Sequence, residues 1–466
     1  MSSDTDESLL SGILGLCGLK PTRPASSGTR LPVTAGVGRE HPASRFPAGY
    51  RPGVSQTIRP ITVDELPAWF EAFGTAFYIW ASDPHASAAA RRDTMDLNRA
   101  LAAFEDDGTI VGTYRSFTTR LTLPGGARVP VDAVSAVSVR PTHRRRGLLT
   151  RMITQDLWNA VDRGEVASIL IAAEWPIYGR YGYGPATWQA KWTLRTRAAT
   201  FQKAPAGSVE VVDALTARSL VPAIYDAYVA GQPGEIDRPD HRWDTELGIV
   251  EFPGRPKWKG QLVIHRDAAG VPDGYARFHG EENWVDMYAE HRMLLDELHG
   301  ATEAADVDLW RHLAQMDLTA TIQAEVRREH EPMQWALSDP RTAQVSGRSD
   351  FLWVRILDVP RALSSRTYER DGELVLEVID RLGDRDGPAA GRYRLAVSAG
   401  ACTSERTEAE PDLDLDVRAL SAALLGGTRL IDAIRTGACT ERRPGALREA
   451  DALFRTANEP WCSTWF

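Results

Sequence analysis

The chain has 466 residues, 43% of them hydrophobic and 25% charged, which is enough for two to four globular domains. The formal net charge of −9 argues against general nucleic-acid binding, and no run of eighteen apolar residues could span a membrane. The four cysteines are scattered and do not have the spacing of a metal site or a disulfide framework, so no bound metal is expected. Reduced thiols are typical of the cytosol, which predicts a cytoplasmic protein.

Residues 1–55 are rich in Ser, Thr, Pro, Gly and Arg, which predicts a flexible N-terminal extension with a short helix near Leu9–Leu16. The apolar run Leu9–Leu19 follows acidic residues instead of Lys or Arg, so it does not have the form of a secretory signal. Ordered structure is expected from Thr57 onward.

Residues 56–200 predict a first α/β domain. Thr62–Glu65 has the pattern of a capping box, and the aromatic residues after it recur at helical spacing over Leu66–Tyr78. Two hairpins are expected next, one of Leu101–Phe104 with Ile110–Tyr114 and one of Phe117–Leu123 with Val129–Val139. The loop Arg140–Gly147 should then lead into a helix through Leu157, and a last strand is expected at Ala167–Ala173.

The rest of the chain predicts two further domains. In residues 201–345, strands are expected at Gly260–His265, Gly274–Phe278 and Trp284–Tyr288, with a helix at Ala301–Gln315. In residues 346–466, strands are expected at Phe351–Val359, Glu373–Asp380 and Arg392–Val397, and helices from Pro360, over Leu413–Leu425 and over Leu430–Ile434. The alternation of strands and helices indicates a mixed α/β class throughout.

The segment Val137–Thr150 carries the strongest chemical signal. A strand runs into a loop with three consecutive arginines and Gly147, and a helix leaves the loop. Backbone N–H groups at a helix N-terminus are unpaired and suit a pyrophosphate, while arginine adds bidentate phosphate contacts. An exposed basic turn is the alternative for such a loop taken alone.

This loop resembles the cofactor motif of the GNAT superfamily of N-acetyltransferases, Arg/Gln-x-x-Gly-x-Gly/Ala. Here Arg144-x-x-Gly147-x-Leu149 departs from it at the last position. The longer string Arg140–Leu149 is similar to the Eis (enhanced intracellular survival) family, as are three later segments in the same order, Ile177–Ala186, Leu352–Pro360 and the terminal Pro-Trp-Cys…Phe. The resemblance covers roughly residues 57–466.

The resemblance implies tandem GNAT-like domains, then a sterol-carrier-protein-like domain, assembled as a homohexamer. It implies acetyl-CoA as cosubstrate and a small cationic amine, such as an aminoglycoside, as acceptor. By position, the cofactor contacts would be Val137, Ser138, Val139, Arg145, Arg146, Gly147, Leu148, Leu149, Thr150, Ala173 and Glu174.

The resemblance also implies the catalytic pair, with Tyr178 as general acid and the terminal carboxylate of Phe466 as general base. The chemistry is consistent with these roles, because an amine arrives protonated and must lose a proton, whereas the departing thiolate must gain one. An α-carboxylate is ionised at neutral pH and a phenol is not.

Trp80, Asp83 and Trp465 are the candidates for contact with the amine, because a cationic substrate favours carboxylates and aromatic faces. Trp465 beside the terminal residue indicates a pocket that is more aromatic and less anionic than in some family members. Two alternatives stay open from the sequence, a protein lysine N-acetyltransferase and a non-catalytic module that binds lipid or CoA.

Overall fold

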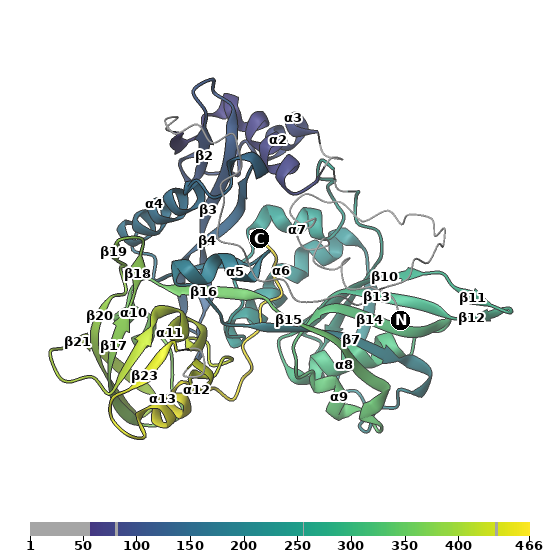
Figure 1. Cartoon of the computed structure of the whole chain (residues 1–466). Coiled ribbons are helices and arrows are strands. Elements are labelled where there is room, and N and C mark those ends of the chain that lie inside the picture. The colour runs from purple at the N-terminus through teal and green to yellow at the C-terminus, as the bar shows by residue number, and fades with distance from the viewer. Residues whose placement is uncertain (1–55, 80–82, 255, 434–436) are drawn as a thin grey trace, which may run out of the picture.

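The structure is a computed structural model that describes residues 56–79, 83–254, 256–433 and 437–466. It contains three lobes, and the C-terminus lies in the centre between them (Figure 1). The predicted N-terminal extension, with its short helix, lies outside the described residues, and so does Trp80. No helix within the described residues is both long and apolar enough to cross a bilayer.

The first lobe is a seven-stranded sheet in the order β1-β2-β3-β4-β5-β16-β6. These strands are β1 (Thr57–Pro60), β2 (Ala100–Phe104), β3 (Ile110–Thr122), β4 (Arg128–Val139), β5 (Ala167–Ile171), β16 (Leu352–Ile356) and β6 (Gly184–Pro185). Its helices are α2 (Leu66–Ala76), α3 (Pro84–Arg91), α4 (Leu148–Asp162) and the short α5 (Trp175–Tyr178). The predicted capping box is confirmed, since the Thr62 and Glu65 side chains each bond the other's backbone ahead of α2.

The two faces of the first sheet are covered differently. The apolar face of α4 packs on one face, through Met152, Ile153 and Leu157. On the opposite face, α2 covers the β2 side, while β4, β5 and β16 share one buried cluster with the third lobe.

The second lobe repeats this plan in its sheet order, β8-β9-β10-β13-β14-β7-β15. Its strands are β8 (Ser208–Val212), β9 (Gln261–Arg266), β10 (Pro272–Glu281), β13 (His291–Gly300), β14 (Thr319–Arg327), β7 (Trp188–Arg195) and β15 (Ala343–Asp350). Its helices are α6 (Ala214–Gly231), α7 (Asp240–Glu246), α8 (Glu303–Ala314) and α9 (Pro332–Ala336). In each unit the fourth and fifth strands are parallel and a helix connects them.

The two units exchange strands. β7 follows the first unit in the chain but pairs with β14 and β15 of the second sheet. β16 follows the second unit but pairs with β5 and β6 of the first. The expected boundaries at residues 200 and 345 therefore assign both strands to the wrong sheet, because pairing with a distant strand leaves no local pattern in the sequence.

The third lobe is a five-stranded sheet in the order β21-β20-β17-β22-β23, covered by helices. Its strands are β17 (Gly372–Ile379), β20 (Gly391–Ser398), β21 (Ala401–Arg406), β22 (Leu413–Asp416) and β23 (Cys439–Glu441), with a small hairpin of β18 (Arg381–Leu382) and β19 (Arg385–Asp386). Its helices are α10 (Val359–Ser364), α11 (Val417–Ala423), α12 (Leu430–Ala433) and α13 (Ala446–Phe454).

Three local predictions are wrong. Ile110–Tyr114 and Phe117–Leu123 form one strand, β3, with a bulge opposite its middle. Trp284–Tyr288 is a tight hairpin of β11 (Trp284–Val285) and β12 (Tyr288–Ala289), because Asp286 and Met287 have positive φ. The predicted helix Leu413–Leu425 begins as strand β22.

One buried ion pair joins the first sheet to the third lobe. The Arg355 guanidinium on β16 donates to both carboxylate oxygens of Asp380 at 3.0 and 3.1 Å, and its Nε donates to the Tyr181 carbonyl at 2.7 Å. Both charged side chains are fully buried. Removal of one partner leaves the other charge buried without compensation.

We therefore expect Arg355→Met to lower the free energy of unfolding by about 3–5 kcal/mol. The control is Arg381→Met, because Arg381 pairs with Asp386 on the exposed β18–β19 hairpin, where about 1 kcal/mol or less is expected. Guanidinium unfolding followed by tryptophan fluorescence measures both. Equal losses of unfolding free energy in the two variants would contradict the stabilising role assigned to the buried Arg355–Asp380 ion pair.

Candidate functional site

The first sheet opens between its two parallel strands. β4 and β5 pair only from Val131 with Ala167 to Ala133 with Ile169. β4 then continues to Val139 without a partner on that side. Unpaired backbone groups on this edge can bond a ligand that enters the gap.

A bulge in β4 fixes the backbone at the gap. The register against β3 shifts between Thr113 and Arg115, opposite Ala136, which has φ +51°. The buried Thr113 hydroxyl donates to the Ala136 carbonyl at 2.8 Å and lies 2.7 Å from the Ser138 hydroxyl. A bulge re-aims the strand after it, so Val137–Val139, the predicted cofactor strand, lines the gap in a fixed orientation.

The basic loop ends at a helix whose N-terminus is open. Gly147 is the N-cap of α4 with φ +76°, no side chain caps it, and the first turn holds no acid. The loop itself is held by Arg146, which donates to the Thr142 carbonyl at 3.0 Å, and by His143, 2.5 Å from Glu105. The first N–H groups of α4, at Leu148–Thr150, are therefore available to an anion such as a diphosphate.

The other predicted cofactor residues lie at the same end of the gap. Ala173 and Glu174 lie between β5, which ends at Ile171, and α5, and both are exposed. Because β4 and β5 are parallel, their carboxyl ends meet at one edge of the sheet. The loop after β4 and Ala173–Glu174 therefore flank the same opening.

Tyr178 lies at the end of α5 and is 7% exposed. Its ring meets Tyr183 edge-on at 6.1 Å. Burial, followed by the neighbouring Tyr181 and Glu174, raises the Tyr178 pKa above its ordinary value, so the phenol keeps its proton. The Tyr181 hydroxyl is 2.9 Å from the Thr150 hydroxyl, which ties this segment to the first turn of α4.

A buried network of hydrogen bonds fixes the Tyr183 side chain. The Ser168 hydroxyl is 2.7 Å from both the Tyr183 hydroxyl and the Asp132 carboxylate. Asp132 pairs with Arg99 at 2.5 Å, and burial together with nearby Asp156 raises the Asp132 pKa to about 8. The network fixes the ring on which Tyr178 packs.

The last residues of the chain run between the lobes and are anchored by the second one. Glu235 accepts hydrogen bonds from both the N–H and the hydroxyl of Ser463, each at 2.7 Å. Arg238 donates to the Thr464 hydroxyl at 2.9 Å. These contacts leave little freedom to the two residues that follow.

The terminal residue itself is buried. The Phe466 ring meets Phe117 of β3 edge-on at 5.8 Å, and Trp465 meets Phe351 edge-on at 4.9 Å. Arg242 of α7 donates to the Trp465 carbonyl at 2.6 Å. Among the residues that the structure describes, none forms an ion pair with the Phe466 carboxylate.

Tyr178 and Phe466 lie on opposite faces of the first sheet and make no direct contact. Phe117 is paired with Ala133, and both pack in the cluster that contains Phe466. Tyr178 belongs to the cluster under α4. Successive residues of a strand point to opposite faces, so the opening between β4 and β5 is the passage from one face to the other.

The predicted amine contacts are only partly brought to this place. Asp83 caps α3, accepting from the His85 N–H at 2.9 Å, and is exposed. Trp465 lies beside the terminal carboxylate, as expected from its position in the chain. The sequence did not single out Phe117 and Arg242, which contact the last two residues of the chain. Its only signal was an aromatic residue on a strand and a cationic residue on a helix, both far away in the chain.

The described residues of the second unit do not have these features. Two residues join β13 to α8, and the helix is capped by the Thr302 side chain and begins with Glu303. The Gly300 N–H donates to Asp306, so acidic groups take the place of the phosphate site. Where β13 and β14 part, Arg327 of β14 donates to the Leu298 carbonyl and lies 5.0 Å from the Trp461 ring.

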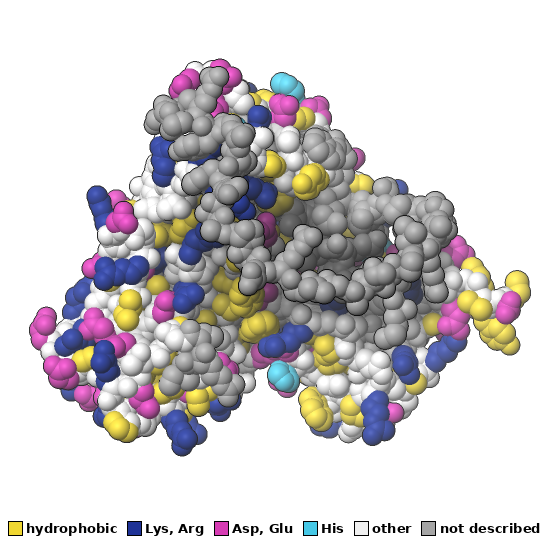
Figure 2. Space-filling view, viewed as in Figure 1, with side chains coloured by type: hydrophobic (Ala, Val, Ile, Leu, Met, Phe, Trp, Pro, Cys, Tyr) yellow, Lys and Arg dark blue, Asp and Glu magenta, His cyan; other side chains and the backbone are white. Residues whose placement is uncertain are grey.

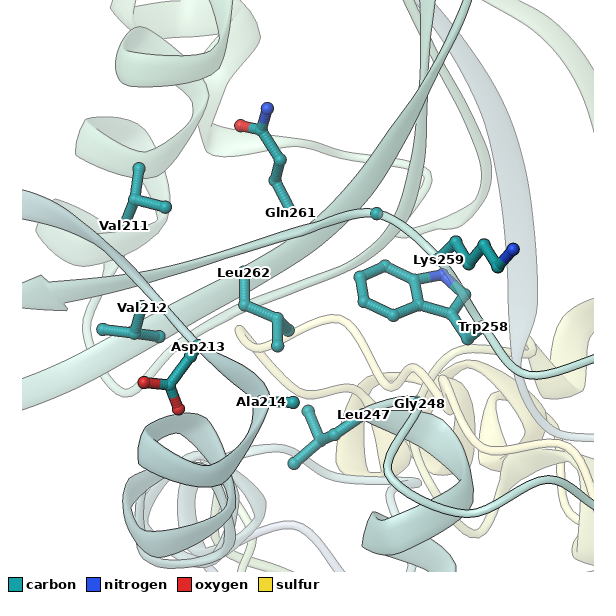
Figure 3. Close-up of a pocket in the computed structure, with 11 residues that line it drawn as sticks. Val211, Val212, Asp213, Ala214, Leu247, Gly248, Trp258, Lys259, Gln261 and Leu262 are labelled. Carbon is teal, nitrogen blue, oxygen red and sulfur yellow. The ribbon is translucent and has the colours of Figure 1, made fainter.

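A shallow groove of about 370 Å³ in the second lobe is separate from the gap in the first sheet. Figure 3 shows Asp213 at one side, at the start of α6, and Trp258 at the other. Asp213 caps α6 through the Thr216 N–H, and the Trp258 indole donates to Asp296. None of the predicted site residues lines this groove.

The described residues contain no group of three or more His, Cys, Asp or Glu side chains placed to hold a metal ion. The candidate site therefore consists of the open helix terminus, the β4–β5 gap, a buried phenol and the chain terminus.

Family models match three segments. Residues 57–186 and 234–356 each match an acetyltransferase (GNAT) domain, and residues 359–463 match a sterol carrier protein domain. The chain is 38% identical to an uncharacterized N-acetyltransferase of Streptomyces avermitilis over 415 residues, 88% of this chain and 98% of the relative. It is thus a GNAT-type N-acetyltransferase with two GNAT domains and a sterol-carrier-like domain.

More specific relatives narrow this class. The chain is 31% identical to N-acetyltransferase Eis of Mycobacterium tuberculosis over 410 residues, 85% of this chain and 96% of the relative. The structure of Eis1 from Mycobacterium abscessus superposes with a TM-score of 0.76 at 33% identity, covering 88% of this chain and all of the other. The chain belongs to the Eis family of N-acetyltransferases.

We expect Gly147→Ala to raise the Kd for acetyl-CoA about tenfold, because a Cβ at φ +76° costs on the order of 1–2 kcal/mol and shifts the α4 N-terminus. Gly270→Ala is the matched control, since Gly270 has φ +83° in a second-lobe turn and, as at Gly147, an added Cβ meets no atom within 4 Å. Calorimetric titration measures both. A Kd unchanged by Gly147→Ala would contradict the cofactor assignment.

Proposed function

We propose that this enzyme transfers the acetyl group of acetyl-CoA directly to a primary amine of a small molecule, with the Phe466 carboxylate as general base and Tyr178 as general acid. The observation that carries this proposal is the burial of the chain terminus on β3, where its carboxylate has no ion-pair partner among the described residues. An anchored carboxylate without a counter-ion is free to accept a proton.

Acetyl-CoA, when bound, supplies the thioester. The N–H groups of Leu148–Thr150, with Arg145 and Arg146, would hold its diphosphate, and the free edge of Val137–Val139 would orient the acetyl arm in the gap. The Phe466 carboxylate takes the proton from the amine on one face of the sheet. Tyr178 holds a proton for the departing sulfur on the other.

The class of amine rests on the family resemblance, which favours small cationic amines such as aminoglycosides. The homohexamer and the cytoplasmic location expected from the sequence stay predictions.

Addition of two glycines after Phe466 should lower kcat at least about 100-fold, because it moves the carboxylate away from the amine. The acetyl-CoA Kd should change less than twofold, since the cofactor loop is on another element. Phe466→Leu is the control, because it keeps a terminal carboxylate and much of the packing. Thiol release from acetyl-CoA with a panel of amines measures kcat, and an active extended chain would refute the assigned base.

Tyr178→Phe should lower kcat about 100-fold or more, whereas Tyr183→Phe, which removes only the hydroxyl bonded to Ser168, should cost less than tenfold. Because the Tyr178 pKa is raised, the phenol stays protonated as pH rises, and the wild-type kcat should not decline from Tyr178 ionisation below pH 10. A descending limb below pH 10 that disappears in Tyr178→Phe would contradict the raised pKa, and an unchanged kcat in Tyr178→Phe would contradict the role as general acid.

A further inference from the structure

One short segment of the second lobe lies between the first sheet and the end of the chain. Residues 232–238 connect α6 to α7, and they pair with the end of β3. The Gly234 N–H donates to the Thr122 carbonyl at 2.8 Å, and the Thr122 N–H donates to the Glu235 carbonyl at 3.0 Å. We call residues 232–238 the strap.

The strap also follows the last residues of the chain. The Gln232 side chain donates to the Glu459 carbonyl at 2.9 Å, and the Trp461 N–H donates to the Pro233 carbonyl at 2.9 Å. In the described chain, the tail after α13, residues 455–466, contains neither a helix nor a strand. Its backbone has no ladder of its own, so its place depends on contacts of this kind.

The contacts between the strap and the tail keep one register. Further along both segments, the Glu235 carboxylate accepts from the N–H and the hydroxyl of Ser463, each at 2.7 Å. Arg238 donates to the Ser463 hydroxyl at 3.1 Å and to the Thr464 hydroxyl at 2.9 Å. The partners advance together along the two segments, so the tail cannot slide by one residue without losing these bonds.

The strap is itself rigid where the tail lies on it. An added Cβ at Gly234, which has φ +92°, would lie 3.2 Å from both the backbone N and the carbonyl O of Trp461, so the two backbones are in direct contact. Arg238 pairs with Glu297 of β13 at 2.5 Å, and both side chains are more than nine-tenths buried. A buried ion pair is costly to break, which fixes the arginine that bonds the tail.

The same strap therefore sets both parts that meet at the terminal residue. Phe117, whose ring meets that of Phe466 at 5.8 Å, lies on β3 five residues before Thr122. Figure 2 shows that the molecule is hollowed between the lobes, and Figure 1 places the C-terminus in this central region. A displacement of a reacting group by about 1 Å can lower a rate about 100-fold, so the register of the tail matters to catalysis.

We propose that the strap is a positioning element of the reaction, which places the terminal residue by its distance from the anchors at Ser463 and Thr464 and not by the length of chain before them. This inference rests on the proposed function, in which Phe466 carries the general base. It assigns Glu235 and Arg238 as positioning residues, because they act through the tail.

Two insertions of one glycine separate register from length. A glycine between Trp465 and Phe466 lies after the anchors and moves the terminal residue by about 3.5 Å, so kcat should fall about 100-fold or more. A glycine between Ala457 and Asn458, which are both exposed, lengthens the tail equally but before the strap. Its kcat should stay within about threefold of the wild type, because the anchors restore the register. Thiol release from acetyl-CoA measures both.

Thr464→Val tests the anchor itself, because it keeps the side-chain shape and removes the hydroxyl that bonds Arg238 and Tyr225, each at 2.9 Å. We expect kcat to fall about threefold to tenfold, the range of one lost hydrogen bond, with an unchanged KM for acetyl-CoA. Carboxypeptidase Y should release the last residue at least about threefold faster, since release needs a detached tail. Thr342→Val is the matched control, a buried threonine of the same lobe that donates to the Asp339 carbonyl at 2.8 Å, and it should change neither value more than twofold.

The outcomes separate the strap from the general base. An equal loss of kcat in the two insertion variants, or an unchanged release rate in Thr464→Val, would overturn the positioning role and leave the proposed acetyl transfer intact. Full activity with a glycine between Trp465 and Phe466 would instead count against the general base assigned in the proposed function. The strap would then have no part in the reaction, even if the release rates showed that it anchors the tail.

Discussion

The structure depends on the fixation of the last six residues between the lobes. Three residues make hydrogen bonds to this segment. Glu235 accepts from the Ser463 N–H. Arg238 donates to the Thr464 hydroxyl, and Arg242 donates to the Trp465 carbonyl. Chain ends are ordinarily the least ordered part of a protein, so a terminal carboxylate can do chemistry only where such contacts offset the entropy of ordering. The residues that supply them all belong to the second lobe, although the Phe466 ring that follows packs on Phe117 of the first.

In the described residues, the second acetyltransferase unit differs from the first at the place of the predicted cofactor site. Its fourth and fifth strands part as those of the first unit do, but the space beside them holds Arg327 and Trp461 of the tail. Its helix α8 begins with acids and is capped by its own side chains, so its N-terminus has no open N–H groups for a phosphate. The open helix terminus thus lies in the first copy of the fold, and the second copy orders the end of the chain.

The sequence predicted the parts of this arrangement that depend on neighbouring residues. The capping box before α2, the basic loop and the helix α4 follow from local patterns, and the structure has them. Three features depend on contacts between residues far apart in the chain: the merger of two expected strands into β3, the exchange of β7 and β16, and the packing of Phe117 against Phe466. Periodicity cannot reveal such contacts, so the place where the chain terminus is buried could not be deduced from the sequence pattern.

The strand exchange also governs the order in which the protein can be built. During synthesis, the first sheet has β5 as an exposed edge until residues Leu352–Ile356 emerge and insert between β5 and β6. Pairings this distant in sequence form slowly, and an unpaired edge invites association with other chains. The N-terminal unit therefore depends on sequence made some 180 residues later, and neither unit is a self-contained module that could be cut out at residue 200 and expected to fold.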